Sequence, residues 1–105
     1  MKKFSDFGIN THEKTNIFPV PKISITDVLN CEIEVLDYES GIKTIHGDDR
    51  YIVKIKSNGI DYKFFTNADP IKKALDKISR ESFPFLATVK QQSFGSGSGK
   101  TYYFI

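Results

Sequence analysis

Apolar and polar residues alternate between positions 50 and 66, on both sides of the dipeptide Asn58-Gly59. Alternation at period two predicts half-buried β-strands. Asn-Gly favours a two-residue turn, because both positions tolerate a positive φ. We therefore predict a β-hairpin over residues 50–66. Its first strand should turn three side chains toward the core: Tyr51, Val53 and Ile55.

The other face of this hairpin is expected to be basic. Lys54 and Lys56 alternate with the core positions of the first strand, so they should face outward. In the second strand the pattern leaves two interpretations open, with either Tyr62 or Phe65 on the outer face. The last strand of the chain leaves the same choice between Tyr102 and Tyr103.

The remaining elements follow from shorter patterns. Residues 24–30 indicate a helical turn capped by Thr26, and residues 31–39 predict a strand with a bulge near Val35 or Leu36. Residues 40–49 are interpreted as a loop, and residues 83–92 and 101–105 as the last two strands. Asp69 is the predicted cap of a helix that Pro70 opens. The apolar face of that helix is expected to contain Ile71, Ala74, Leu75 and Ile78.

The element order is therefore β-β-β-α-β-β. This order in an all-β chain with one helix predicts a five-stranded OB-fold barrel, with the helix plugging one end. Residues 1–24 are polar and contain Pro19 and Pro21, which disfavour a helix. We expect an irregular N-terminal arm over residues 1–24 and an OB-fold domain over residues 25–105.

Composition favours a cytoplasmic compartment and argues against a membrane protein. A chain of 105 residues predicts one domain. The single cysteine, Cys31, cannot form an internal disulfide, which favours a reducing compartment and a small buried apolar role. No apolar run approaches the roughly 20 residues of a membrane helix, so we expect a cytoplasmic protein without membrane attachment.

Charge is distributed unevenly along the chain. Residues 1–49 carry five Lys against nine Asp and Glu, a net charge of −4, while residues 50–105 carry ten Lys and Arg against four Asp and Glu, a net charge of +6. Such asymmetry favours an anionic partner for the second half. The alternative is that the two halves neutralise each other across the fold.

The residues offer little for catalysis or metal binding. The segment Gly95–Thr101 resembles a phosphate-binding P-loop, but only three residues separate its two outer glycines and no helix follows. His46 followed by Asp48 and Asp49 is a thin set of metal ligands. No Ser lies in a nucleophile-elbow pattern, and no spaced pair of carboxylates stands out. We therefore expect no enzyme, no cofactor and no metal.

The interleaved basic and aromatic residues indicate a nucleic-acid ligand instead. Lysines replace counterions on phosphates, and aromatic rings stack on unpaired bases. An OB barrel binds ligands over its second and third strands, between the loops that here are residues 40–49, with His46, and residues 94–100. The expected phosphate contacts are Lys43, Lys54, Lys56, Lys63, Lys90 and Lys100. The expected base contacts are Tyr62, Phe65, Phe94 and Tyr103.

Four short motifs make residues 25–105 resemble the small OB-fold single-stranded-DNA-binding-type proteins of bacteriophages and mobile elements. The motifs are Ile25-Thr26-Asp27-Val28-Leu29 before the first strand, Phe65-Thr66 before the helix, Phe83-Pro84 before the fourth strand and Lys100–Phe104 at the end. The resemblance implies an OB fold and a single-stranded DNA ligand.

Two function classes result. The first is non-enzymatic binding of single-stranded nucleic acid, with DNA favoured over RNA, through the aromatic and basic face of the barrel. The second is a protein-interaction or assembly module on the same barrel, in which exposed aromatic residues and the last strand form a contact between subunits. A homo-oligomer would belong to the second class.

Overall fold

The computed structural model of the protein describes residues 18–93 and 99–105. Its five strands are β1 (Glu32–Thr44), β2 (Gly47–Ser57), β3 (Ile60–Thr66), β4 (Phe85–Ser93) and β5 (Lys100–Phe104). One α-helix, α1 (Asp69–Lys77), lies between β3 and β4, and two short 3₁₀ turns are η2 (Ile25–Val28) and η3 (Arg80–Ser82). The predicted order β-β-β-α-β-β is confirmed.

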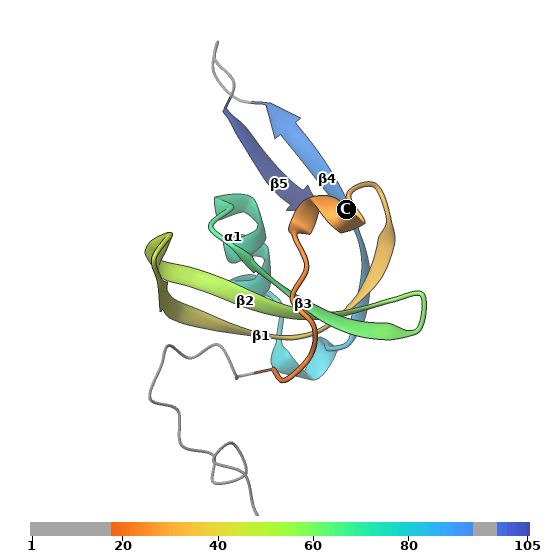
Figure 1. Ribbon diagram of the computed structural model, residues 1–105. Helices are drawn as coiled ribbons and strands as arrows, with labels where there is room; N and C mark the ends of the chain where they lie inside the picture. Colours follow the sequence, from red (N-terminus) through yellow and green to blue (C-terminus); the bar gives the residue numbers. More distant parts are fainter. Residues whose placement is uncertain (1–17, 94–98) are drawn as a thin grey trace, which may run out of the picture.

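All five strands belong to one antiparallel sheet with the order β3-β2-β1-β4-β5. Strand β1 pairs with β4 through residues 32–35 and with β2 from Glu34 onward, so that Glu34 and Val35 pair with both. The hairpin of β4 and β5 therefore stands across the sheet of β1, β2 and β3 (Figure 1). In the described part of the chain β3 and β5 do not pair, so the sheet is not closed into the predicted barrel.

The predicted hairpin is present as β2 and β3. Asn58 and Gly59 have φ angles of 52° and 79°, the positive values that the turn requires. The three predicted core residues of β2 are 7% exposed or less. The predicted bulge is also present, because the pairing of β1 with β2 shifts register between Val35 and Asp37.

The loop predicted over residues 40–49 is wrong. Strand β1 continues to Thr44 and β2 begins at Gly47, so only a tight turn separates them. Gly41 has a φ of 67° and lies at a second register shift, between Glu39 and Ile42. A glycine at such a position serves a bulge in a continuing strand, which a sequence pattern does not distinguish from a loop.

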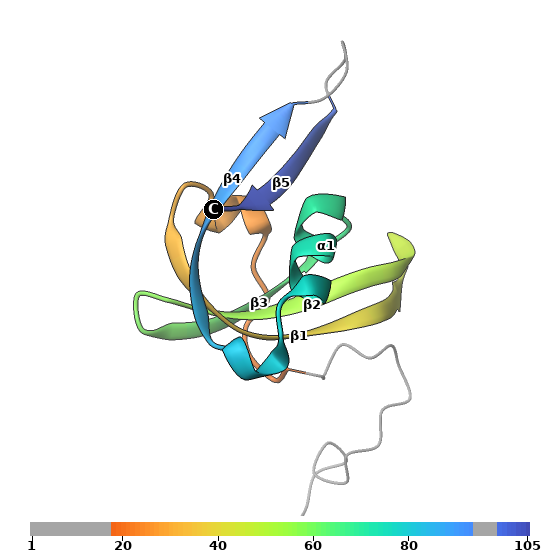
Figure 2. The same ribbon diagram turned by 180° about the vertical axis from the view of Figure 1, so that it is seen from behind.

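The predicted caps shift by one or two residues. Ala68 is the N-cap of α1, where Asp69 was expected, and Pro70 lies in the first turn. Ser24 caps η2, where Thr26 was expected: its hydroxyl accepts from the backbone N–H of Thr26. The apolar face of α1 is confirmed, with Ile71 and Leu75 fully buried. Helix α1 packs inside the angle between the two parts of the sheet (Figure 2).

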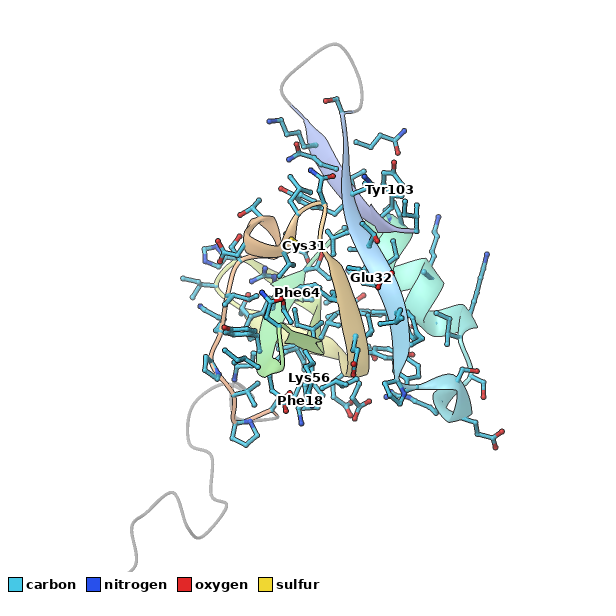
Figure 3. All side chains as sticks on the ribbon, turned by 90° about the vertical axis from the view of Figure 1, so that its right-hand side faces the viewer. Phe18, Cys31, Glu32, Lys56, Phe64 and Tyr103 are labelled. Carbon is cyan, nitrogen blue, oxygen red and sulfur yellow. The ribbon has the colours of Figure 1, made fainter. Side chains whose placement is uncertain are left out.

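The sheet buries apolar residues on both faces. The main core lies on the inner face, under α1, and includes Phe64. A second cluster lies on the outer face and consists of Phe18, Ile42 and Ile52, with Phe65 packed against it. Figure 3 shows Phe18 below the strands β2 and β3 and Phe64 above them.

This arrangement settles both open choices of facing. Tyr62 and Tyr102 pack against the main core, so Phe65 and Tyr103 occupy the opposite face of their strands. The buried role expected for Cys31 is wrong, because its side chain is exposed. Asn30 has a φ of 63° and turns the chain, so Cys31 precedes β1 and does not continue its alternation.

Candidate functional site

A cleft of about 990 Å³ opens where four segments of the chain meet. These are the β1–β2 turn, the end of β3 with its link to α1, the segment leading into η2, and the facing ends of β4 and β5 (Figure 1). The cleft therefore lies between the turn after β1 and the end of the β4–β5 hairpin, near the region where the ligand was predicted. The polar and aromatic side chains of its wall are Lys22, His46, Arg50, Phe65, Asn67, Lys100 and Tyr102.

Two cations lie close to the ring of Phe65 on the wall of this cleft. The Nζ of Lys22 is 5.9 Å from the centre of the Phe65 ring, and the Cζ of Arg50 is 5.2 Å from it. Both distances are within the range of a cation–π contact. An aromatic face flanked by positive charge suits a ligand that carries both a flat ring and a phosphate.

Arg50 is held in place from the strand side. Its Nη1 donates to the Oγ1 of Thr44 over 3.4 Å, and its buried Nε has no hydrogen-bond partner within the described residues. Burial lowers the pKa of Arg50 from its ordinary value, although a guanidinium stays charged at neutral pH. A partly desolvated cation on a cleft wall gains more than an exposed one from an approaching anion.

Two carboxylates also line the cleft and limit its positive charge. Asp27 is engaged locally, because its Oδ2 accepts from the backbone N–H of Ser24 over 2.9 Å. Asp69 lies in the first turn of α1, where its negative charge offsets the positive end of the helix dipole. The favourable position for an anion is therefore around Phe65, away from the helix terminus.

Three of the predicted lysines lie on the outer face of β2 and β3. Lys54 and Lys63 are direct cross-strand partners, and Lys63 is only 8% exposed. Lys56 forms an ion pair with Asp61 over 3.8 Å and lies opposite Glu34 of β1. The carboxylate of Asp61, on the neighbouring strand β3, thus offsets the charge of Lys56.

The other predicted site residues are dispersed. Lys43 is exposed on the far part of β1. Lys90 lies opposite Tyr103, and its Nζ donates to the Oδ1 of Asn30 over 3.3 Å. Tyr62 is on the core side of β3, and Phe94 lies outside the described residues. Of the ten predicted residues, the cleft brings together Phe65 and Lys100.

Sequence reasoning missed Lys22 and Arg50 as members of the site. Arg50 lies two residues before Ile52 and four before Lys54, so the alternation of the outer face already contained it. Lys22 belongs to the expected arm and carries no such pattern. It reaches Phe65 because the backbone of Pro21 and Ile23 pairs with Lys63 at the edge of β3.

Within the described ranges no three His, Cys, Asp or Glu side chains gather into a possible metal site, and none of the helices there is long and apolar enough to cross a membrane.

Comparison with known proteins gives one match. No curated protein and no solved structure matches the chain. A family model described as a domain of unknown function (DUF8468) matches residues 19–105. This match includes every described strand and helix and most of the sequence, so the chain belongs to the DUF8468 family.

Proposed function

We propose that the protein binds single-stranded nucleic acid, DNA before RNA, without catalysing a reaction on it. The observation that carries the proposal is the ring of Phe65, which has Lys22 and Arg50 at 5.9 Å and 5.2 Å from its centre within a cleft large enough for a small ligand. A base stacked on the ring would place its phosphates near these cations.

The strand order supports a related proposal about the fold. In an OB fold the first strand pairs with both the second and the fourth strand, and a helix lies between the third and fourth. The order β3-β2-β1-β4-β5 and the position of α1 agree with that arrangement. We propose that the protein is an open relative of the OB barrel, and that its cleft marks the place where the barrel does not close.

Fluorescence anisotropy with labelled oligo-dT tests the binding. An oligonucleotide of about 16 nucleotides covers the site size of a single OB fold. We expect saturable binding that weakens as salt is added, and a parallel titration with oligo-rU compares RNA with DNA. Absence of saturable, salt-sensitive binding at tens of micromolar protein would overturn the proposal.

Phe65→Leu sharpens this test. Leucine keeps an apolar contact with the outer cluster but removes the flat ring, so loss of one stacked base should weaken binding about 5- to 100-fold. Lys73→Gln is a matched control, because Lys73 is exposed on α1 and does not line the cleft. Equal affinity for the wild type and Phe65→Leu would show that Phe65 does not stack on the ligand.

One observation favours a second candidate function, that of an assembly module. In the described part of the chain no strand pairs with the second edge of β5, and Leu86 and Ile105 on the outside of β4 and β5 are 62% and 68% exposed. Edge pairing between two copies would cover such a strand. Light scattering separates the candidates: a stable oligomer whose interface buries Leu86 and Ile105 would favour assembly over nucleic-acid binding.

A further inference from the structure

The residues Phe18–Ile23 form a strap over the outer face of the sheet. Phe18 is 9% exposed and packs against Ile42 and Ile52. The chain then follows the edge of β3, where the N–H of Ile23 donates to the carbonyl of Lys63 over 2.8 Å, and the N–H of Lys63 donates to the carbonyl of Pro21 over 2.9 Å. In Figure 1 the strap is the orange segment that passes β3 and leads to η2.

The strap covers apolar surface that continues directly from the cleft. Ile52 and Phe65 are cross-strand partners, and the next pair toward the β2–β3 turn is Lys54 with Lys63. Phe65 belongs to both sites, because it lines the cleft and also packs against the cluster that Phe18 covers. Without the strap, this part of the sheet would present apolar and aromatic side chains beside two lysines.

The composition of the strap limits the hydrogen bonds that it can make to the sheet. Two of its six residues, Pro19 and Pro21, have no N–H to donate, and its apolar cluster is separate from the main core. Lys22 and Lys63 form an isolated β-bridge, so two lysines lie side by side on adjacent segments of the chain. Burial first and the charge of Lys22 second lower the pKa of Lys63 from its ordinary value, which indicates that the docked strap places like charges close together.

We infer that the first part of the strap, residues 18–21, is a displaceable cover, and that single-stranded nucleic acid removes Phe18 from Ile42 and Ile52 to gain a second surface for its bases. The hydrogen bond from Ile23 to Lys63 stays in place and keeps Lys22 beside Phe65. The inference rests on the proposed function. The cleft has the volume of a small-ligand pocket, whereas OB-fold sites extend over about 4 to 16 nucleotides. A strand of that length leaves the cleft past Phe65 and meets the surface that the strap covers.

Ligand length is the variable that tests the cover. Phe18→Ala weakens the docked strap, which raises the fraction of molecules with an open surface and so raises the apparent affinity. We expect about three- to tenfold tighter binding of an oligo-dT of about 16 nucleotides, since less of the binding free energy is spent on displacement. An oligo-dT of about four nucleotides, which the cleft accommodates alone, should bind both proteins equally.

Two matched variants control for indirect effects. Phe18→Leu retains apolar cover and should bind the long oligonucleotide nearly as the wild type does. Ile60→Ala removes an exposed side chain at the β2–β3 turn and should change neither affinity. Circular dichroism and thermal unfolding establish that each variant is folded, as expected for changes outside the main core.

Amide hydrogen exchange in the wild type gives a second readout. The N–H of Lys63 donates to the carbonyl of Pro21 in the strap, so displacement should speed its exchange when the long oligonucleotide binds. Slower exchange of this amide in the complex, or unchanged or weaker binding by Phe18→Ala, overturns the strap inference and leaves the proposed function intact. If neither protein binds any oligonucleotide, the proposed function fails and the inference fails with it.

Discussion

Tyr51 connects helix α1 to the sheet through a single hydroxyl group. Its O–H contacts both carboxylate oxygens of Asp76, at 2.9 Å and 2.7 Å. The Nζ of Lys72 lies 5.3 Å from the centre of the Tyr51 ring and donates to the backbone carbonyl of Asp49. Burial first and the hydrogen bond to Asp76 second raise the pKa of Tyr51 to about 12.

Tyr51→Phe should lower the free energy of unfolding by about 0.5–1.5 kcal/mol at neutral pH, because one hydrogen bond is lost while the exposed Asp76 returns to water. The pH dependence has a definite sign. A folded pKa above the unfolded value of 10 gives stability that is complete below pH 10 and lost as pH rises toward 12. Tyr51→Phe has no hydroxyl to ionise, so its stability should not include this loss between pH 10 and 12.

Urea unfolding of both proteins at several pH values between 10 and 12 measures the difference. The wild type should lose its advantage over Tyr51→Phe across this window. Lys63 contributes in the opposite direction, because its lowered pKa releases a penalty as pH rises, but it does so equally in both proteins. Parallel loss of stability in the two proteins would contradict the role of the Tyr51 hydroxyl.

At the scale of elements, the β2–β3 hairpin depends on the backbone of its turn. Gly59 has a φ of 79°, and a Cβ added there would meet no atom within 4 Å. Gly59→Ala should therefore cost about 1–2 kcal/mol through the left-handed conformation alone, without a steric clash. Urea unfolding of the wild type and Gly59→Ala measures this cost. Asn58→Gly serves as the comparison variant, because it relieves the neighbouring positive φ. Equal stability of Gly59→Ala and the wild type would contradict the prediction.

The elements that could be predicted are those whose signals are local. The hairpin and the apolar face of α1 follow from alternation, helical spacing and turn chemistry within a few residues. The run from Ser40 to Asp49 was misread because a bulge glycine and a loop glycine look alike in sequence. Whether β3 and β5 close a barrel depends on pairing across the whole fold, and no local pattern records it.

The same distinction applies to the candidate site. Phe65 was recognisable because its strand alternates, although only packing decided that it, and not Tyr62, faces outward. Lys100 was recognisable from its place after a glycine-rich segment. Lys22 could not be found, because its position beside Phe65 arises from a strap docking on a strand about 40 residues later in the chain.

At the scale of the whole molecule, some cations are held in ion pairs and others line the cleft. Ion pairs occupy Lys56 and Lys72, and the acidic β1 lies beside the basic β2. The cleft retains three cations: Lys22, Arg50 and Lys100.

The salt dependence of the affinity reports how many of these cations contact phosphates. If three phosphates are neutralised, the logarithm of the affinity for single-stranded DNA should fall with the logarithm of salt concentration at a slope of about −2. Lys100→Gln should make the slope shallower by about 0.7, and Lys77→Gln, on the exposed face of α1, should leave it unchanged. Anisotropy titrations at several salt concentrations measure it. A slope near zero would contradict phosphate binding in the cleft.

The position of Tyr102 on the cleft wall gives the protein an optical reporter of its own. The chain has five tyrosines and no tryptophan, so its intrinsic emission comes from tyrosine alone. Tyr102 packs against the main core on one side and lines the cleft on the other, which fixes the ring where a bound base would lie. Occupancy of the cleft can therefore be followed by the quenching of unlabelled protein, and Tyr102→Phe identifies how much of that signal arises at the site itself.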